Sequence, residues 1–166
     1  VLDVTTTEWA DELVGGVLNA GPTRLDAAAS TGTPAVIAPG CLDMVNFWAP
    51  DTIPDRFAGR RFYQHNPNVT LMRTTPEENA ELGRVLARKI NQSVGLVEVY
   101  LPMRAISVIS APGGPFHWPA ADQALFDALR DHLRRDIPLH QLDMAINDAA
   151  FAEAMADGLV RMMARV

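Results

Sequence analysis

The sequence predicts an α/β domain in which a parallel sheet of about four to five strands carries helices on both faces, in three layers. Short apolar runs that end at proline or glycine alternate with longer segments in which apolar residues recur every three or four positions. The 166 residues suffice for one core of ordinary size, and 48% of them are hydrophobic against 20% charged, as in a globular protein. We therefore expect residues 1–166 to form a single domain.

The chain opens with an apolar run at 1–4 that predicts a strand, and a helix is expected directly after it. Thr5 and Glu8 have the spacing of a capping box, in which each side chain bonds an exposed backbone N–H group at the start of a helix. This helix is expected to end at Gly21, which is followed by proline. Residues four apart predict its buried face: Trp9, Leu13 and Val17.

The segment from Gly40 to Thr74 follows a short helix expected at 23–30 and a buried strand expected at 34–38, and it has neither helical nor strand periodicity. Long irregular segments in compact domains are usually functional or disordered. Many large apolar residues argue against disorder. They are Leu42, Met44, Val45, Phe47, Trp48, Phe57, Phe62 and Tyr63. We interpret 40–74 as an ordered loop that builds a site.

Thr75 and Glu78 repeat the capping-box spacing, and Pro76 takes the first helical position, where its missing N–H group costs nothing. This pattern predicts a helix that begins at Pro76. Apolar positions three or four apart give the helix one buried stripe, with the stem of Lys89 at its border. The stripe consists of Leu82, Val85, Leu86 and Ile90.

The rest of the chain predicts two further pairs of a strand and a helix. Strands are expected at 96–101 and 138–142, and amphipathic helices at 121–135 and 148–165. The carboxyl ends of parallel strands lie at one edge of the sheet, and ligands gather at that edge. The segments expected to meet there are 5–8, 40–46, 102–116 and 143–148.

Charge and cysteine content restrict the partners and the setting. The formal charge of −6, without an extended basic stripe, argues against nucleic acid as a partner. No apolar run reaches the ~18 to 20 residues of a membrane span. Cys41 is the only cysteine and no signal peptide is visible, so a reducing, cytoplasmic setting is expected. Because the chain begins with Val1 and not with methionine, we also expect a preceding domain.

Six motifs, in order along the chain, resemble one protein family. They are Asp3–Glu8, Leu42–Phe47, Tyr63–Pro67, Leu71–Asn79, Ala111–Phe116 and Ile146–Asp148. The whole chain is similar to the second of two Rossmann-like halves in the family of ATP-binding-domain proteins that includes the tomato mosaic virus resistance protein. The resemblance implies ATP as a cofactor of the full-length protein. It also assigns the glycine-rich segment that would hold the phosphates to the first half, so this half alone is not expected to bind ATP.

The residues that we predict to bind a ligand are polar or glycine residues near the expected carboxyl edge, most of them beside aromatic side chains. They are Asp43, Asn46, His65, Asn66, Arg73, Arg104, Gly113 and Gly114. Arg73 and Arg104 would supply fixed positive charge, which suits a phosphate or a carboxylate. Two alternatives stay open. In the first, the polar residues of 40–74 only hold the loop in place through hydrogen bonds and bind no ligand. In the second, Gly113-Gly114 is a plain turn, since it lacks the Gly-Lys-Ser/Thr of a phosphate loop.

Catalytic and metal-binding interpretations have less support. Cys41, Asp43 and His65 would suit a thiol nucleophile with its base, but their spacing does not show that they meet. His117 and Asp143, taken together with Asp43 and His65, have no recognised metal-ligand spacing. We therefore assign no catalytic residue and no metal site.

Two functions are compatible with the sequence. In the first, the chain is a ligand-binding half-domain whose segment 40–74 forms a site for a small anionic molecule, in a cleft with an N-terminal half. In the second, it is an interaction module without chemistry of its own, which docks on that half or forms a homo-oligomer with a second copy. The aromatic residues expected to dock are Trp48, Phe57, Phe62 and Tyr63.

Overall fold

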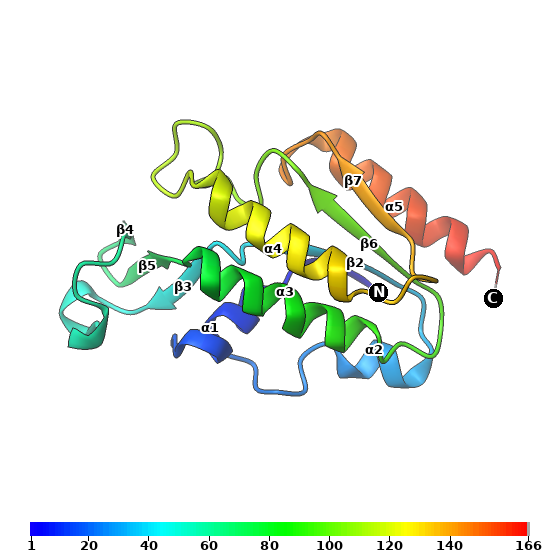
Figure 1. Cartoon of the computed structure of the whole chain (residues 1–166), viewed down its shortest axis with the longest axis horizontal. Helices are drawn as coiled ribbons and strands as arrows, with labels where there is room; N and C mark the ends of the chain where they lie inside the picture. Colours follow the sequence, from blue (N-terminus) through cyan, green and yellow to red (C-terminus); the bar gives the residue numbers. More distant parts are fainter. Residues whose placement is uncertain (166) are drawn as a thin grey trace.

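The computed structural model describes residues 1–165 and confirms the predicted α/β class. Four parallel strands form the main sheet, with β2 and β6 at its centre (Figure 1). In spatial order they are β1 (Leu2–Thr5), β2 (Ala35–Gly40), β6 (Val97–Pro102) and β7 (Leu139–Leu142). Each lies within two residues of the strand expected from the sequence.

Helices cover both faces of this sheet. On one face lie α1 (Glu8–Val14), α2 (Asp26–Thr31), α3 (Pro76–Ile90) and α4 (Pro119–His132), and on the other lies α5 (Ala149–Met163) (Figure 1). Neighbouring residues of a strand point to opposite faces. Accordingly Ile37 belongs to the core beneath α3 and α4, whereas Val36 packs with Phe151 and Met155 of α5. The domain therefore has two cores separated by the sheet.

The prediction that residues 40–74 form an irregular loop is wrong. They contain a second, antiparallel sheet in the order β3 (Met44–Phe47), β5 (Val69–Arg73) and β4 (Phe62–Asn66), which projects from one end of the main sheet (Figure 1). The central strand β5 is buried on both faces from Thr70 to Arg73. Because polar Thr70 and Arg73 are buried together with Leu71 and Met72, the strand shows no alternation of apolar and polar residues.

The first helix also differs from its prediction. Thr5 is still part of β1, so the expected capping box with Glu8 does not form, and no side chain caps α1. The helix ends at Val14, where Gly15 adopts a left-handed conformation (φ 97°) whose N–H group bonds the Asp11 carbonyl. Trp9 is buried as expected, but Leu13 and Val17 are exposed.

The capping box of α3 is confirmed. Thr75 Oγ1 accepts a hydrogen bond from the Glu78 backbone N–H at 3.2 Å, and Glu78 Oε2 accepts one from the Thr75 N–H at 2.8 Å. Arg60 holds the same carboxylate at 2.7 and 2.9 Å. Further along, α3 packs closely on α4, and a Cβ at Gly83 would lie 2.6 Å from the Leu125 carbonyl oxygen. Within residues 1–165 no helix is long and apolar enough to cross a membrane.

Candidate functional site

The segments that follow β2, β6 and β7 meet at the carboxyl edge of the main sheet, where the sequence predicted a site. The Cys41 N–H donates to the Ile106 carbonyl at 2.9 Å. The Ile146 N–H donates to the Ala105 carbonyl at 2.9 Å. Backbone hydrogen bonds thus bring together segments that are far apart in the sequence.

Asp43 lies beneath this edge and is fully buried. Its Oδ2 accepts a hydrogen bond from Ser107 Oγ at 2.7 Å, whose own position is fixed by the Ser110 N–H at 3.1 Å. The second oxygen, Oδ1, has no hydrogen-bond partner among the described residues. Burial raises the pKa of Asp43 to about 6, although the Ser107 hydrogen bond and the Arg73 charge oppose the shift. The Asp43 carboxyl group therefore changes its protonation state near pH 6.

Arg73 joins β5 to the segment that leads into α4. Its guanidinium group, with no exposed side-chain surface, bonds Asp122 Oδ1 at 2.5 Å, the Phe116 carbonyl at 2.9 Å and Thr74 Oγ1 at 2.9 Å. Burial raises the pKa of Asp122, and the Arg73 charge counteracts this shift. Arg73 thus has a structural role, because it connects β5 with the segment at the start of α4.

Asn46 has a similar structural role, whereas two predicted residues are exposed. Asn46 on β3 donates from its side chain to Asp11 Oδ2 at 2.6 Å and from its backbone to Asp11 Oδ1 at 2.9 Å, which ties β3 to α1. His65 and Asn66 lie at the exposed end of β4. Asn66 accepts a hydrogen bond from the Asn68 N–H at 2.9 Å in the turn toward β5.

Aromatic contacts connect β4 with the residues before α4. The Tyr63 ring meets Phe116 edge-on at 6.4 Å and lies 6.4 Å from His65. The guanidinium group of Arg61 lies 5.1 Å from the centre of the Trp118 ring. These contacts place the exposed end of β4 on the same side of the molecule as the glycine turn at 111–115.

Arg104 and the glycine turn are accessible. Arg104 donates from Nε and Nη2 to Asp143, both at 2.9 Å, with side chains 59% and 83% exposed. Gly113 has a left-handed backbone (φ 84°), and nothing lies within 4 Å of where its Cβ would be. A Cβ at Gly114, in contrast, would lie 2.3 Å from the Ile109 carbonyl oxygen. The turn is therefore tight on one side and open on the other.

Cys41 stands between β2 and β3 in a left-handed conformation (φ 60°), which is rare for a residue other than glycine and often marks a functional position. Burial raises the pKa of its thiol to about 11, and the nearby charges of Asp43 and Glu8 act in the same direction. The thiol is therefore protonated at neutral pH and is not an activated nucleophile. In the described part of the chain, no group of three or more His, Cys, Asp or Glu residues is arranged to hold a metal ion.

Sequence comparison identifies the family. Residues 1–163 match the model of the "Uncharacterised protein family (UPF0261) C-terminal domain". The chain belongs to this family. A UPF0261 protein of Clostridium tetani is 49% identical over 98% of this chain and 41% of its own length. A UPF0261 protein of Rhizobium meliloti is 51% identical over 93% of the chain and 39% of its own length.

The resemblance to the tomato resistance protein family is also confirmed. The ToMV resistance protein Tm-1(GCR237) of Solanum lycopersicum is 40% identical over 98% of this chain and 22% of its own length. This chain thus spans about two fifths of the length of these bacterial relatives and about one fifth of the length of the tomato protein. ATP binding stays a prediction from the resemblance.

In this UPF0261 C-terminal domain the eight predicted residues fall into two groups. Buried residues organise the edge: Asp43, Asn46 and Arg73. Residues accessible to a ligand are His65, Asn66, Arg104 and Gly113, with Gly114 partly covered. The structure ties segments 40–74 and 103–118 together, as the prediction of a shared edge requires. Three cavities found in the described part of the chain are lined by other residues.

The polar residues that hold Asp43 and Arg73 at the carboxyl edge were not predicted from the sequence. Ser107 and Ser110 stand three residues apart just after β6, a spacing at which one serine often bonds the backbone of the other, and this was the available signal. Asp122 gave no signal of its own, because it lies in the amphipathic pattern of α4 and its partner Arg73 is 49 residues away.

Proposed function

We propose that this UPF0261 C-terminal domain is a ligand-binding half-domain that holds a small anionic molecule at the carboxyl edge of its main sheet. One observation carries the proposal. Two buried ties, from Asp43 to Ser107 and from Arg73 to the Phe116 carbonyl, fix segments 40–74 and 103–118 against each other at this edge. Rigidly held loops at the carboxyl edge of a parallel sheet are the usual place for a ligand.

Arg104 is the candidate that contacts the anion. Its partner Asp143 is even more exposed, and an ion pair between two solvent-exposed groups contributes little to stability. A phosphate or carboxylate can therefore compete for the guanidinium group, which binds such groups through two parallel hydrogen bonds. Gly113 would offer its backbone N–H group, whereas the Gly114 N–H already donates to the Ala111 carbonyl at 2.8 Å within the turn. His65 and Asn66 would lie at the rim.

A second part of the longer protein would complete the cleft. The bacterial relatives contain more than twice the length that this chain matches, and ligand pockets occur preferentially at domain interfaces. The exposed Arg104 and the open side of the glycine turn would then face that part. A nucleotide such as ATP is one ligand of the right chemistry, because its phosphates are the kind of group that an arginine and a glycine turn contact.

A thermal-shift screen tests the proposal. ATP, other nucleotides and small phosphorylated metabolites are screened against the 166-residue chain and against the full-length protein. We expect anionic phosphate compounds to raise the melting temperature of the full-length protein, and Arg104→Ala to abolish that shift. Arg130→Ala, which removes another exposed, ion-paired arginine on α4, should leave it intact. An equal shift in the Arg104→Ala variant would contradict the proposal.

A second candidate function is an interaction module. Of the four aromatic residues expected to dock, Trp48 is largely exposed (50%), Phe57 is in the core, and Phe62 and Tyr63 are half-buried. The better-supported surface is on α5, which leaves Val160 and Met163 65% and 61% exposed. Light scattering on Val160→Glu and wild-type protein tests this function. Loss of a dimer would support an interface on α5, and an unchanged monomer would exclude α5 as a homodimer interface.

A further inference from the structure

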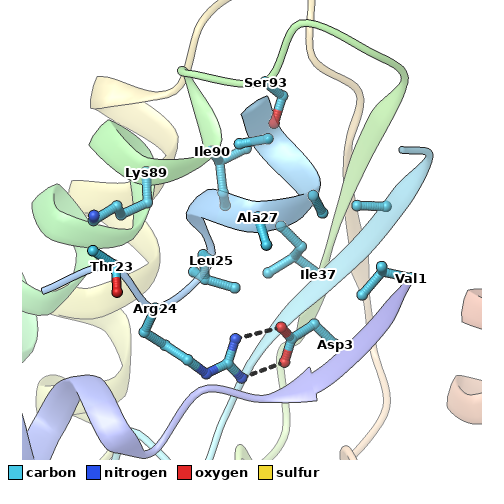
Figure 2. A pocket seen from close by; sticks show the side chains of 13 residues that line it. Val1, Asp3, Thr23, Arg24, Leu25, Ala27, Ile37, Lys89, Ile90 and Ser93 are labelled. Carbon is cyan, nitrogen blue, oxygen red and sulfur yellow. Dashed lines mark hydrogen bonds and ion pairs between the residues drawn. The ribbon is translucent and has the colours of Figure 1, made fainter. Parts of the chain in front are cut away.

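A cavity of about 350 Å³ lies between the main sheet and the helices α2 and α3, apart from the carboxyl-edge site (Figure 2). Strands β1 and β2 form its floor, and the segment leading into α2 runs along one side. The volume falls within the range of about 300–1,000 Å³ that is typical of ligand pockets. Exposed residues, among them Val1 and Ala27, form part of its wall, so the cavity opens to solvent and a small molecule could enter it.

The cavity exists because its wall is built from short side chains. Alanines line it from α2 and β2, and the remaining apolar wall is supplied by Val1, Leu25, Ile37 and Ile90. Leu25 has a left-handed backbone (φ 79°), a strained conformation that points its side chain toward the cavity (Figure 2). A larger residue at an alanine position such as Ala28 would fill this space.

The charged residues of the wall are already paired with each other. Arg24 donates to both oxygens of Asp3, at 2.6 and 2.7 Å, and this pair bridges the segment before α2 to β1 (Figure 2). Lys89 pairs with Asp26 at 2.7 Å. An anionic ligand would have to displace one of these carboxylates, because each of the two cations already has a carboxylate partner. Hydroxyl groups of Thr23 and Ser93 supply polar but uncharged contacts.

We infer that this cavity binds a neutral, mainly apolar small molecule, such as a fused aromatic ring with one hydrogen-bonding group. An apolar cavity of about 150 Å³ is known to hold benzene. The present volume therefore has room for two fused rings, and the hydroxyl groups at its wall would orient one polar atom. This ligand class differs from the anion proposed for the carboxyl edge, so the two sites would act independently.

The test is a titration of the 166-residue chain with indole, a neutral fused ring, followed by amide chemical shifts in nuclear magnetic resonance spectra. We expect saturable shifts at Leu25, Ile37 and Ile90. Ala28→Leu should abolish them by filling the cavity. Ala152→Leu, an alanine substitution on the exposed face of α5, should leave them unchanged. If Ala28→Leu does not fold, Ala27→Leu serves instead, since Ala27 lines the cavity but is largely exposed.

Indole-3-carboxylate is the charge control, and we expect it to bind at least about tenfold more weakly than indole because the two cationic side chains of the wall, Arg24 and Lys89, are already paired with Asp3 and Asp26. The titration uses the chain with an acetylated N-terminus, since the Val1 ammonium group also lies at the cavity. Three results would overturn the inference. They are the lack of saturable shifts around the cavity with indole, binding that persists in the filled variant, and binding of the carboxylate as tight as that of indole.

Discussion

At the scale of single residues, Asp43 is the most informative group at the carboxyl edge. It is completely buried, only one of its two oxygens has a partner among the described residues, and burial raises its pKa to about 6. In the unfolded chain an aspartate has a pKa near 3.9. The folded state therefore binds the proton more tightly, and the resulting stabilisation is present below about pH 4 and lost as the pH rises through 6.

Asp43→Asn removes this titration while keeping the shape and an oxygen acceptor for Ser107. Between pH 7 and pH 5 the wild type should gain about 1 kcal/mol more in free energy of unfolding than the variant. Urea denaturation of both proteins at the two pH values measures the difference. Parallel pH dependences in the two proteins would mean that the pKa of Asp43 is not raised.

Thr75 tests local capping at the same scale. Thr75→Ala removes the oxygen that accepts the Glu78 N–H hydrogen bond, and it should lower the free energy of unfolding by about 0.5–2 kcal/mol. Thr5→Ala is the matched control, because Thr5 has the same spacing from Glu8 but does not cap α1; its effect should stay within about 0.5 kcal/mol. If both variants behave alike in urea denaturation, the capping box does not stabilise α3.

At the scale of elements, a buried ion pair is one of the contacts that hold the small sheet to the main domain, beside the Asn46–Asp11 hydrogen bonds and the shared core. Arg73 is the last residue of β5, and Asp122 lies in the first turn of α4. Removing one member of a buried pair leaves the other charge without compensation, which typically costs about 3–5 kcal/mol.

Arg73→Ala should therefore cost about 3–5 kcal/mol in urea denaturation. Arg130→Ala, which breaks an exposed pair on the same helix α4, should cost no more than about 1 kcal/mol. The double variant Arg73→Met with Asp122→Leu should recover part of the loss, because it removes both charges, although the buried Phe116 carbonyl and Thr74 Oγ1 still lose their donor. A loss below about 1 kcal/mol for Arg73→Ala would mean that the pair does not anchor β5.

The elements also show what the sequence can predict and why. The main sheet, α3 and its cap were predictable because their signals are local: an apolar run, a stripe with helical spacing, and Thr75 three residues before Glu78. The small sheet was not predictable from periodicity, since β5 is buried on both faces and carries Arg73 inside. The meeting of loops at the carboxyl edge followed from the parallel order of the strands. The burial of Asp43 did not, because it depends on Ser107, 64 residues away.

At the scale of the whole molecule, the domain presents an ordered edge, and in the proposed function a second part of the longer protein completes it. Arg104 and the open side of the glycine turn are accessible, and the buried groups beneath them are fixed by hydrogen bonds. The relatives named above extend well beyond the part that this chain matches. We therefore propose strong ligand binding by the full-length protein and weak binding by this chain alone.

The most direct test of this account is calorimetric titration with ATP and magnesium, performed on the full-length protein, on its Arg104→Ala variant and on the 166-residue chain. We expect saturable binding of ATP to the full-length protein. We also expect affinities lower by about tenfold or more, about 1.4 kcal/mol, for the variant and for the isolated chain. Equal affinity of the isolated chain and the full-length protein, or an unchanged affinity after Arg104→Ala, would contradict the proposal.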